Sequence, residues 1–248
     1  RVEDSKGREF QCEVTTLRKD GGYTDGRRPD NVTFGNDIAE DLARRDFTIN
    51  AMAIEPMNGL LGEESPSGKL IDLDGRGVKD LQSGLLRTVG QAEERIAEDG
   101  LRMVRAFRFL DQGEGGLREF DPELSIAISS NIPMLSKVSR ERIWNELQRI
   151  LSCSNSMLIV ESMVEHGIFE EILPGISINT NTSMSNDYIV NLALICRDEV
   201  SGGAEMSDKI ASLLRLSRKE SSALSSLHEC REIDLDPSVE SVLSLIHI

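Results

Sequence analysis

The segment RRDFTIN places two arginines and an aspartate directly ahead of a half-apolar run. The guanidinium groups of Arg44 and Arg45 can hold a triphosphate through paired hydrogen bonds, and the carboxylate of Asp46 can accept a hydrogen bond from a sugar hydroxyl. This combination suits a nucleotide site. Short charged clusters are common at helix ends, however, so spacing alone favours a surface network of arginine and aspartate.

A second cluster lies in the segment EDGLRMVRAFRF. On a single helix, Asp99, Arg102 and Arg105 would lie three residues apart on one face, and Arg108 would continue the row. A carboxylate beside a guanidinium offers an acceptor and fixed donors in one plane, an arrangement that can pair with the edge of a nucleobase. The usual meaning of this pattern is a solvated ladder of salt bridges.

The IDLD stretch carries Asp72 and Asp74 two residues apart. On a strand both carboxylates would point to one face, as in sites that hold two Mg²⁺ ions for phosphoryl transfer. The same four letters recur at residues 233–236, and turn residues flank both copies. We therefore do not expect this pair to bind a metal.

Other kinds of catalytic site find no support in the sequence. Three histidines stand apart from any HExxH or triad context, and neither a phosphate-binding GxxxxGK loop nor a GxGxxG fingerprint occurs. The four cysteines are widely spaced with no CxxC pair, which argues against zinc. Without a signal peptide they favour a reducing compartment, so we expect a cytoplasmic protein, or a mitochondrial or plastid one in a eukaryote. No run approaches the roughly 18 apolar residues of a membrane span, so no membrane partner is expected.

The composition favours helices packed through aliphatic faces. Of the 248 residues, 39% are hydrophobic but only 4% are aromatic. The formal net charge of −15 argues against a generic reader of nucleic acid. A local basic region built from the arginine clusters is still compatible with an acidic protein.

The first third of the chain mixes α and β patterns. We expect a strand over residues 10–17, a long exposed loop over 18–32, and a helix over 35–46 with Asn36 or Asp37 as N-cap. Residues 70–81 predict a short strand, a glycine-rich turn and the start of a helix.

Beyond Thr88 the pattern becomes helical. Residues 91–112 predict one long amphipathic helix, and residues 139–152 predict another with Ser139 at its N-cap. The remainder reads as helices and short loops, with no internal repeat.

Six separated motifs occur in this order along the chain: EVTTLR, DGRRPD, EDLARRDFTINAMA, LIDLDGRGVKDLQSGLLRTVG, AEDGLRMVRAFRF and SRERIWNEL. Together they resemble the class II tRNA nucleotidyltransferases and bacterial-type poly(A) polymerases, from about residue 10 to residue 175. The resemblance implies an α+β fold: a partial polymerase-β-like nucleotidyltransferase head over residues 1–86, a helical neck with a base-reading helix over 87–150, and an all-helical body over 151–248.

The same resemblance implies an activity and a set of site residues. The family builds the CCA end of tRNA from CTP and ATP without a nucleic-acid template. By resemblance, Arg44 and Arg45 contact the nucleotide and Asp46 the ribose. Asp99 and Arg102 act as a protein template for cytosine and adenine edges. Arg105 and Arg108 complete the pocket against the phosphates.

Three further expectations follow from the resemblance. Residues 18–30 look like the flexible loop linked to switching from C to A addition, and Glu13 matches a third acidic residue near the active centre. The DGRGVKDL motif resembles the hinge between head and neck, which implies a structural role for Asp72 and Asp74. The Mg²⁺ ligands, a DxD motif, are expected upstream of residue 1, so we expect the 248-residue chain alone to be inactive.

Two alternatives to CCA addition stay open from the sequence. The same motifs fit a poly(A) polymerase, which continues with ATP alone. The net charge and the absence of the family's metal-binding DxD from these 248 residues also suit a non-catalytic module that binds RNA or nucleotide. A third interpretation is a helical scaffold in which the arginine rows only form salt bridges.

Overall fold

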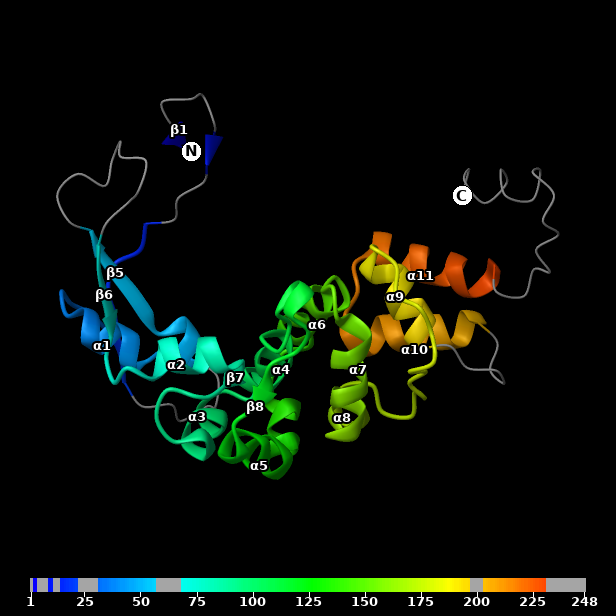
Figure 1. The fold of residues 1–248 in the computed structure, drawn as a ribbon. Coiled ribbons are helices and arrows are strands. Elements are labelled where there is room, and N and C mark those ends of the chain that lie inside the picture. Colours follow the sequence, from blue (N-terminus) through cyan, green and yellow to red (C-terminus); the bar gives the residue numbers. More distant parts are fainter. Residues whose placement is uncertain are drawn as a thin grey trace. The chain divides into compact units, whose positions relative to one another are not determined.

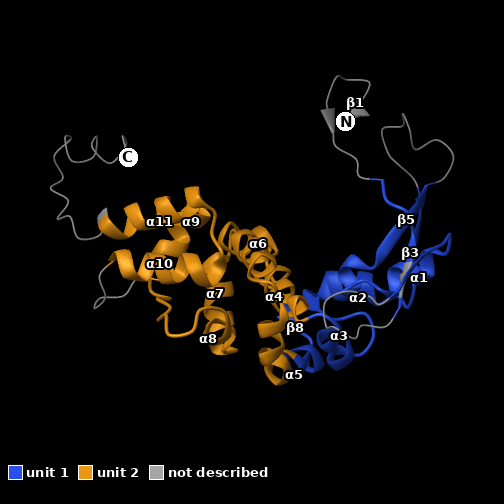
Figure 2. Ribbon diagram, turned by 180° about the vertical axis from the view of Figure 1, so that it is seen from behind, with its two compact units in different colours: residues 1–99, 119–127 blue, residues 100–118, 128–248 orange. Residues whose placement is uncertain are grey.

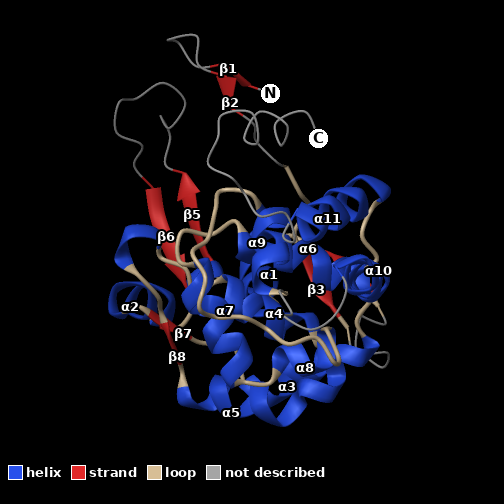
Figure 3. Cartoon of the chain, turned by 90° about the vertical axis from the view of Figure 1, so that its right-hand side faces the viewer, coloured by secondary structure: helices blue, strands red, loops and turns tan. Residues whose placement is uncertain are grey.

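The computed structural model describes residues 2–3, 9–10, 14–21, 31–56, 68–196 and 203–230 (Figure 1). Within these residues, helices outnumber strands, and every sheet has two strands (Figure 3). The antiparallel pairs are β1 (Val2–Glu3) with β2 (Glu9–Phe10), β3 (Arg18–Asp20) with β4 (Val32–Phe34), and β5 (Met52–Pro56) with β6 (Gly68–Asp72). The parallel pair is β7 (Leu85–Leu86) with β8 (Glu119–Phe120). The expected α+β class is confirmed.

Two compact units divide the chain: unit 1 comprises residues 1–99 and 119–127, and unit 2 comprises residues 100–118 and 128–248 (Figure 2). Unit 1 contains the strands and the helices α1 (Ile38–Ala43), η1 (Thr48–Asn50), α2 (Arg76–Ser83) and α3 (Ala92–Glu98). Helix α5 (Pro122–Asn131) begins in unit 1 and ends in unit 2. The division into head, neck and body at residues 86 and 150 stays a prediction.

Unit 2 is helical in its described residues. It contains η2 (Gly113–Gly115), η3 (Ile132–Lys137), α4 (Leu101–Arg108), α6 (Arg140–Leu151), α7 (Ser156–Glu165), α8 (Ile168–Ile172), α9 (Tyr188–Ile195), α10 (Gly203–Leu214) and α11 (Arg218–Cys230). Helix α4 packs against α6, and Val104, Phe107, Ile143 and Leu147 are fully buried in the core. Among the described residues, no helix combines the length and apolar character needed to cross a membrane.

A buried polar network anchors the segment that follows RRD in unit 1. The Thr48 hydroxyl donates to a buried carboxylate oxygen of Asp80 at 2.7 Å. Arg87 bridges Asp80 at 3.2 Å and Asp121 at 2.8 Å. The network joins η1, α2 and the residue ahead of α5, because buried carboxylates require such partners.

The second glycine of the DGRGVKDL motif, Gly77, lets α2 lie directly on η1. A Cβ at Gly77 would come within 2.8 Å of the Thr48 carbonyl oxygen and within 2.7 Å of the Met52 side chain. Only glycine fits this approach of helix to backbone. The predicted strand, turn and helix over residues 70–81 are confirmed as β6 and α2.

Several other element predictions can be compared with the structure. Asp37 is confirmed as the N-cap of α1, since its carboxylate accepts from the Ala39 N–H at 2.8 Å. Ser139 does occupy the N-cap position of α6, although its side chain makes no cap hydrogen bond. The strand expected over 10–17 is wrong for residues 14–17, which are irregular, and the expected loop over 18–32 starts in β3 and reaches β4.

The single helix predicted over residues 91–112 is wrong. It is broken between α3 and α4, and Asp99 is extended there, with φ −151° and ψ 107°. A Cβ at Gly100 would meet the Met134 carbonyl oxygen at 2.9 Å, so the chain needs glycine at this close contact. Glycine is also the poorest helix former after proline, and the break falls beside it.

Candidate functional site

The arginines of the RRD segment are held by a carboxylate that the sequence analysis did not single out. Asp41 on α1 is only 2% exposed. Its Oδ2 accepts from the Nε and Nη2 atoms of Arg45 at 3.2 and 3.0 Å, and its Oδ1 accepts from Nε of Arg44 at 3.1 Å. A carboxylate three and four residues ahead of two arginines is a favourable helical pairing, and that spacing is a signal from which Asp41 could have been found.

Asp41 also connects these arginines to β3. Its Oδ1 accepts from the Arg18 N–H at 3.2 Å, and Nε of Arg44 donates to the Arg18 carbonyl oxygen at 3.1 Å. Burial alone would raise the pKa of the Asp41 carboxyl, but hydrogen bonds from Arg44, from the Arg18 backbone and from Arg45 together lower it. The carboxylate therefore stays charged and holds both guanidinium groups in place.

Asp46 is half-buried at the end of the segment. Its Oδ1 accepts from the Phe47 N–H at 3.0 Å, and its carbonyl oxygen accepts from the Val89 N–H at 3.1 Å. The fully buried Phe47 ring fixes the backbone beside it. Asp46 is thus held at the edge of the unit 1 core.

Asp99 and Arg102 do not share a helix face as the sequence analysis expected. Asp99 is the C-cap of α3, whereas Arg102 lies in the first turn of α4. The Arg102 residue is 7% exposed, so it is a buried arginine and not a solvated one. A buried guanidinium group has few accessible rotamers, so it can present its hydrogen-bond donors in fixed directions.

Arg105 and Arg108 are held across helices by Glu146. The Glu146 carboxylate on α6 accepts from Nη1 of Arg105 at 3.3 Å and from Nε of Arg108 at 2.6 Å. The Arg108 guanidinium also lies 3.8 Å from the Phe109 ring centroid. Glu146 is buried, and it lies 38 residues from Arg108, so no local spacing in the sequence pointed to it. These pairs are interhelical contacts and not an exposed ladder along one helix.

The two aspartates of IDLD stabilise the turn into α2. Asp72 accepts from the Gly77 and Val78 N–H groups at 3.2 and 2.9 Å. Asp74 accepts from the Arg76 N–H at 3.2 Å and pairs with its guanidinium. Burial acts to raise the pKa of the Asp74 carboxyl, but the Arg76 hydrogen bonds outweigh it and lower the value. These contacts match the structural role that we expected for the pair.

The described residues do not fit a magnesium centre. Across the described ranges, no group of three or more acidic, histidine or cysteine side chains could hold a metal ion. Glu13 and residues 22–30 of the expected flexible loop lie outside the described residues. Their predicted roles stay predictions.

The thiols and histidines that are described are packing residues. Burial, with a smaller effect of Asp111, raises the pKa of Cys153 to about 11, and burial raises the pKa of Cys196 to about 12. Neither thiol is activated as a nucleophile. His166 packs edge-on against Phe107, and the buried His228 hydrogen-bonds to a serine hydroxyl.

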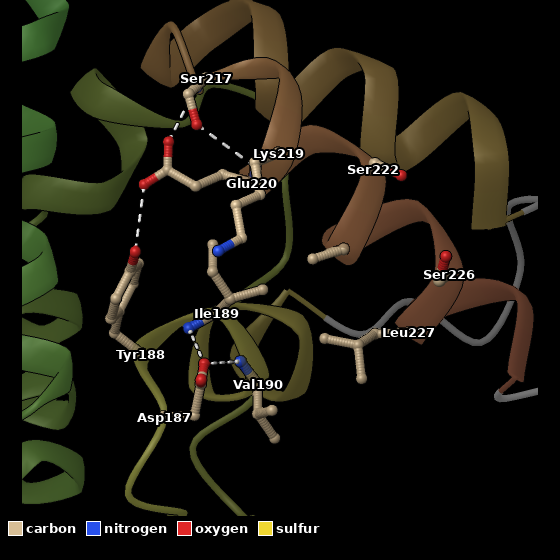
Figure 4. A pocket seen from close by; sticks show the side chains of 11 residues that line it. Asp187, Tyr188, Ile189, Val190, Ser217, Lys219, Glu220, Ser222, Ser226 and Leu227 are labelled. Atoms are coloured by element: carbon tan, nitrogen blue, oxygen red, sulfur yellow. Dashed lines mark hydrogen bonds between the residues drawn. The ribbon is translucent and has the colours of Figure 1, made fainter. Parts of the chain in front are cut away.

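A separate pocket of about 720 Å³ lies between α9 and α11 (Figure 4). Tyr188 and Ile189 line one side, and Lys219, Glu220 and Leu227 line the other. None of the predicted nucleotide residues lines it. Pocket size therefore does not identify the site that the sequence motifs indicate.

Comparison with known proteins places the chain in a family. The Poly A polymerase head domain model matches residues 2–87, and the model described as the probable RNA and SrmB-binding site of polymerase A matches residues 119–179. Together the two models match more than half of the chain. The chain belongs to the tRNA nucleotidyltransferase and bacterial-type poly(A) polymerase family.

Curated members of this family include similar CCA-adding enzymes. One from Lactobacillus johnsonii is 44% identical over 164 residues, which are 66% of this chain and 37% of that enzyme. One from Bacillus subtilis is 37% identical over 188 residues, 76% of this chain and 44% of that enzyme. The chain thus spans less than half the length of these relatives.

A solved family structure matches most of the chain. The crystal structure of the Bacillus stearothermophilus CCA-adding enzyme in complex with CTP matches with a TM-score of 0.69 at 28% identity. The match covers 93% of this chain and 55% of that one. The resemblance seen in the sequence motifs is confirmed.

Replacing Asp41 with Asn should destabilise unit 1 by about 2–3 kcal/mol at neutral pH, because two arginines lose a buried counter-charge. The partial exposure of Arg45 keeps this loss below that of a fully buried pair. The pKa of folded Asp41 lies below the unfolded value, so its stabilisation is complete above the unfolded pKa and is lost as pH falls through the folded pKa. Urea unfolding of parent and variant, followed by circular dichroism from about pH 7 to about pH 3, should show the difference closing on the acid side.

The exposed Glu55 of β5 offers a matched control. Glu55→Gln should change the unfolding free energy by less than about 0.5 kcal/mol. An Asp41→Asn difference that stays constant or widens as the pH falls would contradict the paired-carboxylate account.

Replacing Glu146 with Gln should lower the unfolding free energy of unit 2 by about 2–4 kcal/mol, because Arg105 and Arg108 then face an uncharged amide. Trp144 is the single tryptophan and is buried on the same helix, so its fluorescence reports unfolding of this unit. Arg149 reaches Glu146 only at 3.9 Å and is 63% exposed, so Arg149→Gln should cost less than about 0.5 kcal/mol. Equal effects of the two substitutions would show that Glu146 is not the anchor.

Proposed function

We propose that this chain carries the nucleotide-selecting part of an RNA nucleotidyltransferase that adds CCA to tRNA 3′ ends from CTP and ATP without a template. The similarity to curated CCA-adding enzymes is the observation that carries the proposal, because it extends over 164 residues at 44% identity in one relative and over 188 residues at 37% identity in another. The CCA-adding name of these relatives favours this activity over poly(A) synthesis.

In this proposal the RRD segment binds the sugar and the triphosphate. Arg44 and Arg45 bind phosphate oxygens, and Asp46 accepts a hydrogen bond from a ribose hydroxyl. The fixed pairing of both guanidinium groups with Asp41 supports this role, since donors held in place lose little entropy on binding.

Asp99 and Arg102 are proposed to read the base. Cytosine and adenine each present an exocyclic amino group, which donates, beside a ring nitrogen, which accepts. A carboxylate accepts from the amino group while a guanidinium donates to the ring nitrogen. Uracil and guanine present a carbonyl oxygen where the amino group would stand, so the carboxylate would face another acceptor.

Arg105 and Arg108 are proposed to complete the pocket on its phosphate side. Their shared partner Glu146 leaves a net positive group of two arginines around one carboxylate. Such a local excess of positive charge is compatible with a net charge of −15 for the chain. It would favour a triphosphate and the tRNA backbone over neutral ligands.

Mg²⁺ is the cofactor that we propose for the complete reaction, as family membership implies. In this family's chemistry it neutralises the triphosphate and activates the attacking hydroxyl. The described residues offer no ligand set for it, so the roles assigned above concern binding and selection only.

Nucleotide titration tests the proposal directly. In buffer with Mg²⁺, calorimetry should show CTP and ATP binding at least about tenfold tighter than UTP and GTP, the discrimination expected of one bidentate base contact. Asp99→Ala should abolish this difference. Glu94→Gln, on the exposed side of α3, should leave it unchanged.

Two results would contradict the proposal. Equal binding of all four nucleotides would exclude base reading by this chain. Unchanged selectivity in Asp99→Ala would mean that Asp99 is only a helix-terminal residue.

A further inference from the structure

The Arg95 side chain on α3 holds the backbone of the RRD segment. Nη2 of Arg95 donates to the Ala43 carbonyl oxygen at 3.1 Å and to the Arg45 carbonyl oxygen at 2.8 Å. Its Nη1 donates to the Glu98 carboxylate at 2.7 Å. The Arg95 side chain is 12% exposed, so it lies largely under protein rather than in solvent.

The carbonyl groups that Arg95 binds come from the end of α1. Helix α1 ends at Ala43, and the last carbonyls of a helix have no partner within it. A cation at this end satisfies them and matches the negative end of the helix dipole. The bond to Arg45 extends this capping into the segment proposed to bind phosphate.

Arg95 also belongs to the helix that leads into Asp99. Helix α3 ends at Glu98, which Arg95 itself binds, and Asp99 follows directly as C-cap. One guanidinium therefore joins the backbone of Arg45 to the last turn before Asp99. All of these residues lie in unit 1.

A second tether already fixes the other side of the RRD segment. Phe47 forms a β-bridge with Thr88, and the Val89 N–H donates to the Asp46 carbonyl oxygen at 3.1 Å. The bond from Arg95 on α3 to the Arg45 carbonyl oxygen adds a restraint from a residue 50 positions away in sequence. This restraint would prevent the segment from rotating about its contacts with Thr88 and Val89.

We infer that Arg95 is a positioning residue that sets the separation between Arg45 and Asp99, and thereby the selectivity for the base of the nucleotide. This inference rests on the proposed function of Arg45 and Asp99. Both carbonyl contacts lie at the protein surface, so water can replace the guanidinium there. Loss of Arg95 should thus loosen the geometry far more than it destabilises the fold.

The test compares the parent chain with two variants. Arg95→Gln removes the bonds to both carbonyls, whereas Glu98→Gln removes the ionic partner of Arg95 and keeps Arg95 itself at the carbonyls. Amide hydrogen exchange without nucleotide measures the positioning, and calorimetry with CTP, ATP, UTP and GTP measures the selectivity. Thermal unfolding by circular dichroism confirms that each variant is folded.

In Arg95→Gln we expect exchange to rise at least about tenfold at residues 44–47 and at residues 99–102 together, because one tether serves both. The preference for CTP and ATP should fall by at least about tenfold, as in loss of one base contact. Glu98→Gln should retain slow exchange and the preference of the parent chain.

Unchanged exchange at either segment in Arg95→Gln would overturn the inference whatever the nucleotide result, since the exchange measurement needs no ligand. Retained selectivity with raised exchange would also overturn it. A parent chain that binds all four nucleotides equally would refute the proposed function, and with it the role in selectivity, while the exchange result would still report whether Arg95 couples the two segments.

Discussion

A carboxylate shielded from water must be paired with positive charge, and this requirement organises both arginine clusters. Asp41 is buried on α1 and holds Arg44 and Arg45, while Glu146 is buried on α6 and holds Arg105 and Arg108. Leaving either carboxylate unpaired would cost several kcal/mol, on the order of 3–5 for a buried pair. Each acid therefore fixes two guanidinium groups that could otherwise sample many rotamers.

Fixed arginines make the proposed polyanion site compatible with an acidic protein. The net charge of −15 describes the whole chain, whereas binding depends on the field where the ligand lies. In each cluster, two arginines paired with one carboxylate already have their side-chain freedom restricted. The same constraint reaches the backbone through Asp41, which accepts from the Arg18 N–H, so β3 and the RRD segment keep a fixed relation.

The sequence predicts features that depend on neighbouring residues, and it does not predict contacts between residues far apart in the chain. The Asp37 cap, the β6–α2 turn and the structural use of Asp72 depend on neighbouring residues, and all were anticipated. Glu146 and Arg95 act across 38 and 50 residues, so no spacing rule could reveal their partners. The break at Gly100 arises from a close approach to Met134, and this contact overrode the helical periodicity on either side.

The central proposal is that the RRD segment and Asp99 bind one nucleotide. A crystal structure of this chain with CTP tests it most directly. The account predicts phosphate oxygens within hydrogen-bond distance of Arg44 or Arg45, with the cytosine amino group at the Asp99 carboxylate. CTP bound in the pocket between α9 and α11, or with its base away from Asp99, would contradict the account.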